Sequence, residues 1–342
     1  MKTNVKTLVT IGAVVVLAGG YFALSSWASS EAVREVRMAL IDTNLDRAVR
    51  YGDVSASLLG GSVTLHDVQV RDADGRGIAT TADKLVVSDI EKDHDRLTAI
   101  RMRFEGLSLP VLEAARQPKE SGGLLAFLNP TTRIELVGMG YSTLNGTMEI
   151  YGQVDPGLRE ASVDIEADFD DFQAIEMKLA VAGVDKSTFD AVIDAQALIA
   201  AKTIFGLLDK APKVLEAASR LELKDLQITT QDRGLHARAL PNLAEKYLIS
   251  GSPHERAVSI AGNVKRDIRY NLERQNTAPL IVDEISTKIA GYVEEGGELT
   301  MTTRIDHPIP LFERGGFLGV RPAPVIQSVD RFMALTDAKL EN

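Results

Sequence analysis

The feature that most constrains the fold is an alternation of apolar and polar residues whose parity reverses within one short stretch. Val63 and Leu65 occupy odd positions, whereas Val68 and Val70 occupy even positions, with a polar pair between them. Side chains of a strand point alternately to its two faces, so the reversal would turn half of these residues outward. A β-bulge at the polar pair keeps them on one face and bends the strand, and the alternative is two short strands that meet there.

Related patterns recur along the chain. Leu221 to Ile228 repeats the reversal almost letter for letter, Ile100 to Leu109 is a looser copy, and Ile134 to Tyr141 is a fourth. Neighbouring strands bent at comparable positions would form a curved sheet with a concave apolar face. The candidate bulge residues are His66, Asp67, Lys224 and Asp225. The candidate groove residues, which equally suit an ordinary core, are Val63, Leu65, Val68, Val70, Ile100, Met102, Phe104 and Leu107.

The composition is that of a folded protein. With 342 residues, 45% of them hydrophobic, the chain is long enough to bury a sizeable core in one large or two medium domains. Acidic residues outnumber basic ones by 48 to 38, and the formal charge of -10 argues against nucleic acid or an anionic membrane surface as the main partner. The absence of cysteine excludes disulfides and thiolate metal sites.

The amino terminus carries an uncharged apolar segment, Thr7 to Ser30. About 24 residues at a rise of 1.5 Å give roughly 36 Å, enough to cross the hydrocarbon core of a bilayer. Tyr21 and Trp27 suit the membrane–water interface. We expect a retained membrane anchor, and the alternative is a signal peptide cleaved after Ser26 to Ala28. Because long downstream domains are translocated regardless of nearby charges, we place the bulk of the chain outside the cytoplasm.

Alternating segments joined by short turns predict a curved, mainly antiparallel sheet, and amphipathic segments predict packed helices, so the expected class is α+β. Ser252 to Glu255 has the pattern of a capping box, and Gly296 and Gly297 end the following helix. Strands are also expected at Thr132 to Tyr141 and, as the return of a second hairpin, at Leu235 to Ala239. The expected parts are the membrane anchor (1–30), a linker helix (31–48), a β-rich half (49–184), a helical insertion with a second β/α half (185–314) and a tail with a helix (315–342).

Sequence patterns of catalysis are not found. The chain has no glycine-rich phosphate loop, no Gly-x-Ser-x-Gly turn, no paired zinc histidines and no dinucleotide fingerprint. Its five histidines are scattered and fit surface or structural positions. We therefore expect a protein that is not an enzyme and uses neither a cofactor nor a metal.

Three segments together resemble the opening of AsmA-like proteins: YGDVSASLLGGSVTLHDVQVRDADG, ADKLVVSDI and LTAIRMRFEGLSLP, which follow the apolar amino terminus. Later segments, LELKDLQITTQDRG and GGELTMTTRIDHPIPL, resemble smaller periplasmic relatives of the YdgA type. The resemblance implies a single-pass protein of the bacterial inner membrane, with its bulk in the periplasm and a curved sheet shaped as a trough. It also implies a role in phospholipid transport or outer-membrane homeostasis.

Two functions follow as hypotheses. The first is envelope lipid handling, in which the curved sheet shelters an acyl chain, such as that of a phospholipid, or an apolar segment of a partner. The second is a scaffold or adaptor without catalysis, which recruits a protein complex of the envelope by strand addition or through its acidic surface. About ten strands spaced about 4.8 Å apart give a sheet of roughly 50 Å, too short to bridge the periplasm alone.

Overall fold

The structure, a computed structural model, describes most of the chain after the amino-terminal segment. The predicted membrane anchor, with Tyr21 and Trp27, and the predicted linker helix up to Asp46 lie outside the described residues. Among the helices that are described, none is long and apolar enough to span a bilayer. The described residues are 48–57, 61–71, 77–93, 96–117, 128, 130–185, 188, 216–217, 219–314 and 320–342.

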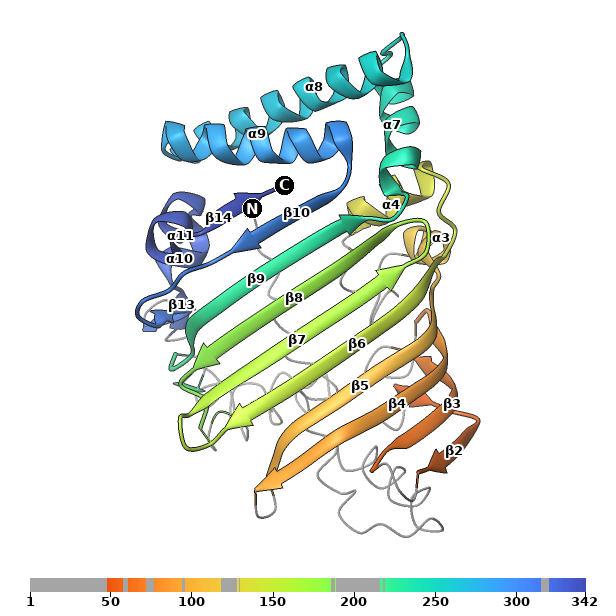
Figure 1. Ribbon diagram of the computed structural model, residues 1–342, viewed down its shortest axis with the longest axis vertical. Coiled ribbons are helices and arrows are strands. Elements are labelled where there is room, and N and C mark those ends of the chain that lie inside the picture. The colour runs from red at the N-terminus through yellow and green to blue at the C-terminus, as the bar shows by residue number, and fades with distance from the viewer. Residues whose placement is uncertain are drawn as a thin grey trace. The chain divides into compact units, whose positions relative to one another are not determined.

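The chain forms two compact units, each an antiparallel sheet with helices, so the expected α+β class is confirmed (Figure 1). Unit 1 holds the described residues up to Ile165 and the short stretch that begins at Gly183. Unit 2 holds Glu166–Ala182 and Ser219–Asn342. The chain passes from unit 1 into unit 2 within strand β7 (Glu160–Phe169).

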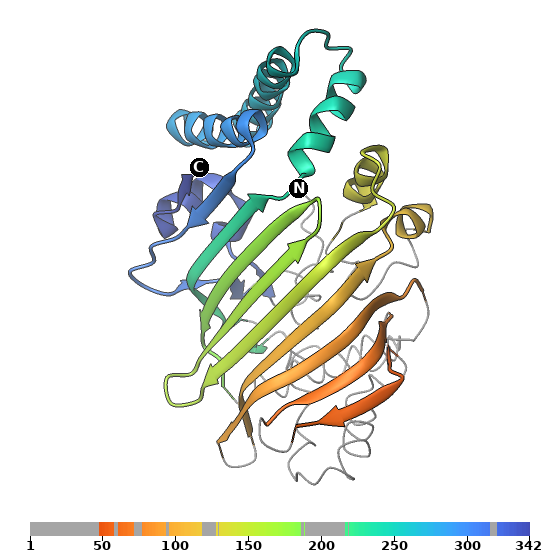
Figure 2. The same cartoon turned by 45° about the vertical axis from the view of Figure 1, so that its right-hand side comes forward.

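Unit 1 is built on antiparallel strands that follow one another in the sheet largely in chain order (Figure 2). The order is β1-β3-β4-β5-β6, with β2 also paired to β3. Only two residues separate β4 from β5, and such a short turn joins only antiparallel neighbours, whereas residues 110–143 separate β5 from β6. The strands are β1 (Val49–Arg50), β2 (Asp53–Ala56), β3 (Val63–Val70), β4 (Thr80–Asp93), β5 (Arg96–Leu109) and β6 (Leu144–Asp155).

A row of backbone irregularities crosses these strands. Gly52 separates β1 from β2, and the registers place Asp67 of β3 opposite it, then Asp83 of β4, then Gly106 of β5. Asp67 and Gly106 have positive φ, 52° and 61°. Because each strand reverses its parity at the same level, the register between them does not slip. Where β5 pairs with β6, β5 does carry one extra residue. The register shifts between the pair made by Phe104 and the pair made by Leu107.

The predicted strand at Thr132 to Tyr141 is wrong, because the structure has helix α4 (Pro130–Gly138) there, close to the short helix α3 (Val111–Arg116). Proline suits the first turn of a helix, where its missing N–H costs no hydrogen bond. Arg133 and Leu136, one helical turn apart, are buried, whereas Ile134 is 62% exposed. The repeated parity pattern at this fourth site therefore reflected helical spacing.

Unit 2 has the strand order β8-β9-β10-β14, with β11 also paired to β9. Strand β9 carries one extra residue. Ala180 pairs with Asp225 and Val181 with Leu223, so the extra residue of β9 at this register shift is Lys224. The strands are β8 (Gln173–Ala182), β9 (Glu222–Asp232), β10 (Glu298–Thr302), β11 (Ile309–Pro310) and β14 (Lys339–Glu341), with a separate hairpin of β12 (Phe312–Arg314) and β13 (Val320–Pro322).

The second predicted hairpin is wrong, because helix α7 (Leu235–Lys246) replaces its return strand. The carboxylate of Asp232 accepts hydrogen bonds from the backbone N–H of His236 at 2.9 Å and of Gly234 at 3.3 Å. These bonds satisfy amide groups that a helix start leaves without partners. A side chain at the end of β9 thus starts the helix.

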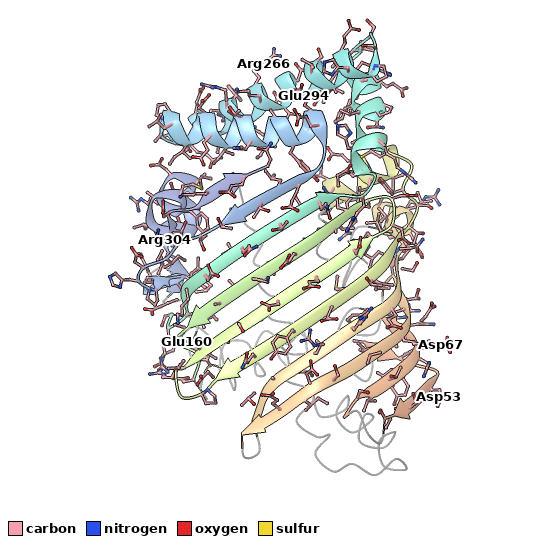
Figure 3. All side chains as sticks on the ribbon, in the orientation of Figure 1. Asp53, Asp67, Glu160, Arg266, Glu294 and Arg304 are labelled. Atoms are coloured by element: carbon pink, nitrogen blue, oxygen red, sulfur yellow. The ribbon has the colours of Figure 1, made fainter. Side chains whose placement is uncertain are left out.

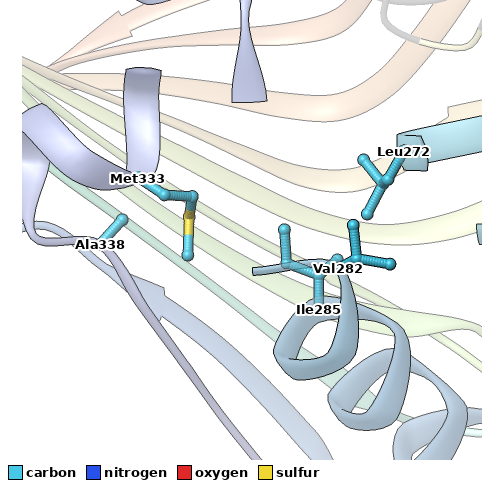
Figure 4. Packing of buried hydrophobic residues seen from close by; sticks show 5 residues of the cluster. All are labelled: Leu272, Val282, Ile285, Met333 and Ala338. Atoms are coloured by element: carbon cyan, nitrogen blue, oxygen red, sulfur yellow. The ribbon is translucent and has the colours of Figure 1, made fainter. Parts of the chain in front are cut away.

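Two longer helices, α8 (Pro253–Glu273) and α9 (Pro279–Glu295), form a hairpin as the sequence predicts. Ser252 and Glu255 form the expected capping box. The predicted final helix is divided into α10 (Pro324–Gln327) and α11 (Val329–Thr336), and the chain then ends in β14. Helices α8, α9 and α11 share a hydrophobic core (Figure 4). Its buried residues are Leu272, Val282, Ile285, Met333 and Ala338, and Leu340 of β14 packs against them.

Candidate functional site

The eight residues that the sequence offers as groove lining all lie on the apolar side of unit 1. All are buried, from 1% exposure at Val63, Val68 and Leu107 to 9% at Val70. They form the core of this unit and present no open apolar surface. The candidate bulge residues are not part of this apolar side. His66 and Asp67 lie where β3 has a residue with positive φ, and Lys224 lies at the register shift of β9. Asp225 accepts a hydrogen bond from Thr303 Oγ1 at 3.2 Å.

The polar side of unit 1 is held by a cluster around one arginine. Arg101 on β5 donates to Asp89 at 2.5 Å and to Glu149, and its guanidinium lies 4.6 Å from the centre of the Tyr151 ring. The hydrogen bond to Asp89 raises the pKa of Arg101, burial opposes that rise, and Glu149 adds to it. Because Asp89 has φ of 50° and precedes a register shift in β4, the cluster fixes a second bend.

The apolar side of unit 2 differs from that of unit 1 in being only partly buried. Opposite residues of antiparallel strands point to the same side of the sheet. The registers therefore place Met177, Ile228 and Met301 in one row across β8, β9 and β10. All three side chains are partly exposed. They form an apolar row that solvent or a ligand can reach.

One polar group stands beside this row. Thr230 lies between Ile175 and Leu299 in the neighbouring row. Its Oγ1 is buried and makes no hydrogen bond with any part of the chain that the structure describes. Leaving a buried hydroxyl unpaired costs about 1–3 kcal/mol, so such a group calls for an explanation. A ligand oxygen can accept its hydrogen bond only when the side chains that cover Oγ1 move aside.

Helix α9 borders the apolar side of unit 2. Gln173, on the same side of β8 as Met177, donates from Nε2 to the hydroxyl of Tyr292 at 2.7 Å. Leu340 of β14 pairs with Met301 and packs against the helical core. The row therefore runs from β8 through β9 and β10 to Leu340 of β14, and a side-chain hydrogen bond links α9 to β8.

The opposite side of the same strands is polar. Lys178 pairs with Glu176 at 2.6 Å, and Thr300 donates to Thr229 at 3.1 Å. No group of three metal-binding side chains is found within the described residues. The polar side thus offers ion pairs and hydroxyls already engaged with one another, and the apolar row with Thr230 is the candidate site.

The comparisons with known proteins point to unit 2. A family model described only as an uncharacterized protein matches residues 166–329, just under half of the chain. None of the curated proteins matches the chain. The match begins at Glu166, the first residue of unit 2, and includes β8, β9 and β10 with helices α7 to α9. The strands that carry the apolar row therefore belong to the part of the chain that recurs in other proteins.

The sequence predicts an apolar site in unit 1, whereas the partly exposed apolar row lies in unit 2. The alternation in Gln173 to Val181 predicts that Met177 faces an apolar environment, and the same holds for Ile228 and Met301. Which apolar side stays partly exposed depends on what covers it, and alternation carries no information about that. The sequence gives no indication of Thr230, because what marks it is that its hydroxyl finds no hydrogen-bond partner among the described residues.

Proposed function

We propose that this protein is an AsmA-like protein anchored in the bacterial inner membrane, with its bulk in the periplasm, and that it handles acyl lipids of the envelope without catalysis. The carrying observation is the partly exposed row of Met177, Ile228 and Met301, beside which the Thr230 hydroxyl has no hydrogen-bond partner among the described residues. Methionine suits such a surface because its flexible thioether adapts to different apolar partners. An acyl chain lies along the row and displaces the side chains that cover the Thr230 hydroxyl, and an ester or carboxyl oxygen then accepts its hydrogen bond.

Unit 1 has a supporting part in this proposal. Its apolar side is buried, and its aligned bulges and the Arg101 cluster stiffen a bent sheet. In chain order it stands between the proposed membrane span at Thr7 to Ser30 and the lipid contact of unit 2. An uncharged segment of this length supports the membrane tether, and the resemblance of Tyr51 to Pro110 to AsmA-like proteins supports the periplasmic location.

A second function, that of an adaptor recruiting an envelope protein complex, is favoured by one observation. The eight predicted groove residues of unit 1 are all buried, so an acyl chain has no open trough there. If unit 2 binds an apolar segment of a partner protein in place of lipid, the same row serves the adaptor. The two functions therefore differ in the occupant of one site.

Lipid extraction and native mass spectrometry of the full-length protein, purified from membranes, separate these functions. We expect phospholipid to copurify with the wild type and to fall several-fold in Thr230→Val and in Met301→Glu. Two variants are matched controls. Thr80→Val removes a hydroxyl that is also buried and unpaired within the described residues, but in unit 1, and Thr302→Glu adds the same charge on the polar side of β10.

The outcomes divide clearly once circular dichroism shows that each variant is folded. Loss of lipid in the two row variants but in neither control supports lipid handling. A wild type without lipid overturns it and leaves the adaptor. Equal loss in Thr230→Val and Thr80→Val shows that the hydroxyl has no part in binding.

A further inference from the structure

The side of unit 2 that carries the apolar row has a polar end, where β8 begins and β9 ends. The register pairs Gln173 with Asp232, so both point to the same side of the sheet as Met177. Along β9, Thr230 stands between Asp232 and Ile228 of the row. All five residues are partly exposed. This side of the sheet therefore changes from polar to apolar along the strands, with Thr230 at the boundary.

The spacing along the strands suits an amphiphilic ligand. Gln173 and Met177 are four residues apart in β8, which at the rise of a strand is about 13 Å. A ligand that reaches both the polar end and the row must therefore be polar at one end and apolar over the rest. An acyl lipid has this form, with its head group at Gln173 and Asp232 and its chain on the row.

The polar end offers hydrogen-bond acceptors. Asp232 accepts the N–H of His236 with Oδ1 at 2.9 Å, and its Oδ2 has no hydrogen-bond partner among the described residues. Gln173 donates from Nε2 to the Tyr292 hydroxyl at 2.7 Å, which fixes its amide and leaves Oε1 without a partner in the same part of the chain. Two open acceptors, one of them charged, suit a cation with N–H groups to donate.

The charge around this end is negative. A ring nitrogen of His236 lies 3.0 Å from the carbonyl oxygen of Glu294, so the end of α9 stands beside the start of α7 (Figure 3). Residues 291–298 hold three acidic residues and no basic one. The arginines next along the chain from Asp232, Arg233 and Arg238, already form ion pairs with aspartates, at 3.6 and 3.2 Å. The polar end is therefore complementary to a cation.

We propose, building on the lipid binding proposed above, that the preferred ligand is a phospholipid with a primary ammonium head group, phosphatidylethanolamine. The ammonium donates to Asp232 and Gln173, an ester oxygen stands at Thr230, and the acyl chain lies on the row. Phosphatidylcholine has the same charge but no N–H to donate, and phosphatidylglycerol has no cation and is anionic. The expected order of binding is therefore ethanolamine, choline, glycerol.

A competition among the three lipids tests this order. Full-length protein in detergent is equilibrated with equal amounts of the three, all with identical acyl chains, and the bound lipids are counted by native mass spectrometry. Lipid that stays on Met301→Glu is held outside the row and is subtracted. We expect phosphatidylethanolamine to exceed phosphatidylglycerol about threefold or more, and phosphatidylcholine about twofold.

Variants of the carboxylates test the cause of the preference. Asp232→Asn keeps an oxygen for the start of α7 and removes the charge, so it should abolish most of the preference while total lipid changes little. Glu166→Gln is the matched control, because it removes an exposed carboxylate on the opposite side of β7. If circular dichroism shows that Asp232→Asn is unfolded, Glu294→Gln tests the charge, since His236 contacts only the backbone of Glu294 among the printed bonds of the fold.

The outcomes separate this inference from the proposed function. Lipid bound in the input ratio, or enriched in phosphatidylglycerol, overturns the ammonium preference and leaves lipid handling intact. A wild type with no more lipid than Met301→Glu overturns both. An equal preference in the wild type and Asp232→Asn shows that the carboxylate does not select the head group. Displacement of bound lipid by an equal concentration of free ethanolamine identifies a small amine as the ligand and also overturns the proposal.

Discussion

Gly106 of β5 lies opposite Asp83 of β4, and the aspartate carboxylate occupies the space that a β-carbon at position 106 would need. Gly106 also has φ of 61°, which favours glycine. Two independent constraints therefore meet at one bulge. We expect Gly106→Ala to lower the free energy of unfolding by about 3 kcal/mol, measured by urea denaturation.

The chain offers controls that separate the two constraints. Gly140 also has positive φ, 89°, but a β-carbon there meets open space. Gly140→Ala should therefore cost only about 1 kcal/mol, the price of the backbone conformation. Adding Asp83→Ala to Gly106→Ala should recover most of the difference, because the carboxylate is removed but the β-carbon of residue 83 still lies 3.0 Å from the new one. If both glycine variants lose the same stability, the carboxylate is not the obstacle.

The bulge of β9 predicts an unusual tolerance to deletion. Removing Lys224 leaves Leu223 and Leu226 two positions apart, so a straight strand keeps both on the apolar side. The deletion should cost about 1 kcal/mol, whereas deletion of Gln227 sends Ile228 to the polar side and should cost about 3 kcal/mol or more. Thermal unfolding of the two deletions checks the order, and a larger loss without Lys224 would show that the bulge is indispensable.

These bulges mark what the sequence predicts well. Strand β3 has the predicted bounds, Val63 to Val70, because both of its faces keep strict alternation on each side of Asp67. The reversal of parity in β4 is not visible in the sequence, because the small residues Thr80 and Ala82 take the buried positions before it. The alignment of Asp67 with Asp83 is a matter of register between strands, and no single segment encodes it.

The wrong predictions fall on segments whose local pattern fits both a strand and a helix. Apolar residues spaced by two, then three, then two positions fit a bulged strand, and they also fit one face of an amphipathic helix. The segment of α4 has this spacing and forms a helix. At α7 the deciding group, the Asp232 carboxylate, was present in the sequence but was interpreted as part of a hairpin turn. The candidate site was harder still, because the exposure of Met177 and the missing partner of Thr230 are tertiary properties.

The capping box at α8 gives a pH-dependent prediction. The backbone N–H of Ser252, with its hydroxyl, donates to the Glu255 carboxylate and lowers the pKa of Glu255. A carboxylate whose pKa is lower in the folded state stabilises the fold above its unfolded pKa, and this contribution is lost as the pH falls through the folded pKa. Glu255→Gln should therefore lower the unfolding temperature at neutral pH.

The same variant should have the stability of the wild type at a pH below the folded pKa of Glu255. Glu284→Gln, on the exposed surface of α9, is the comparison, because the capping box is formed by Ser252 and Glu255. Calorimetric scans from neutral to acidic pH measure both. A difference between wild type and Glu255→Gln that persists unchanged in acid would contradict the assignment.

The hydrogen bond between Gln173 and Tyr292 connects the stability of unit 2 to its candidate site. Tyr292→Phe removes the hydroxyl with little change in shape, and the loss of one such bond should cost about 1 kcal/mol. Because this bond links α9 to β8 beside the apolar row, we expect faster hydrogen exchange in α9 while α11 is unchanged. If the row binds acyl chains, the looser helix should also raise the amount of copurified lipid. Faster exchange throughout unit 2 would instead show a general loss of stability, and unchanged exchange in α9 would show that the bond does not hold the helix in place.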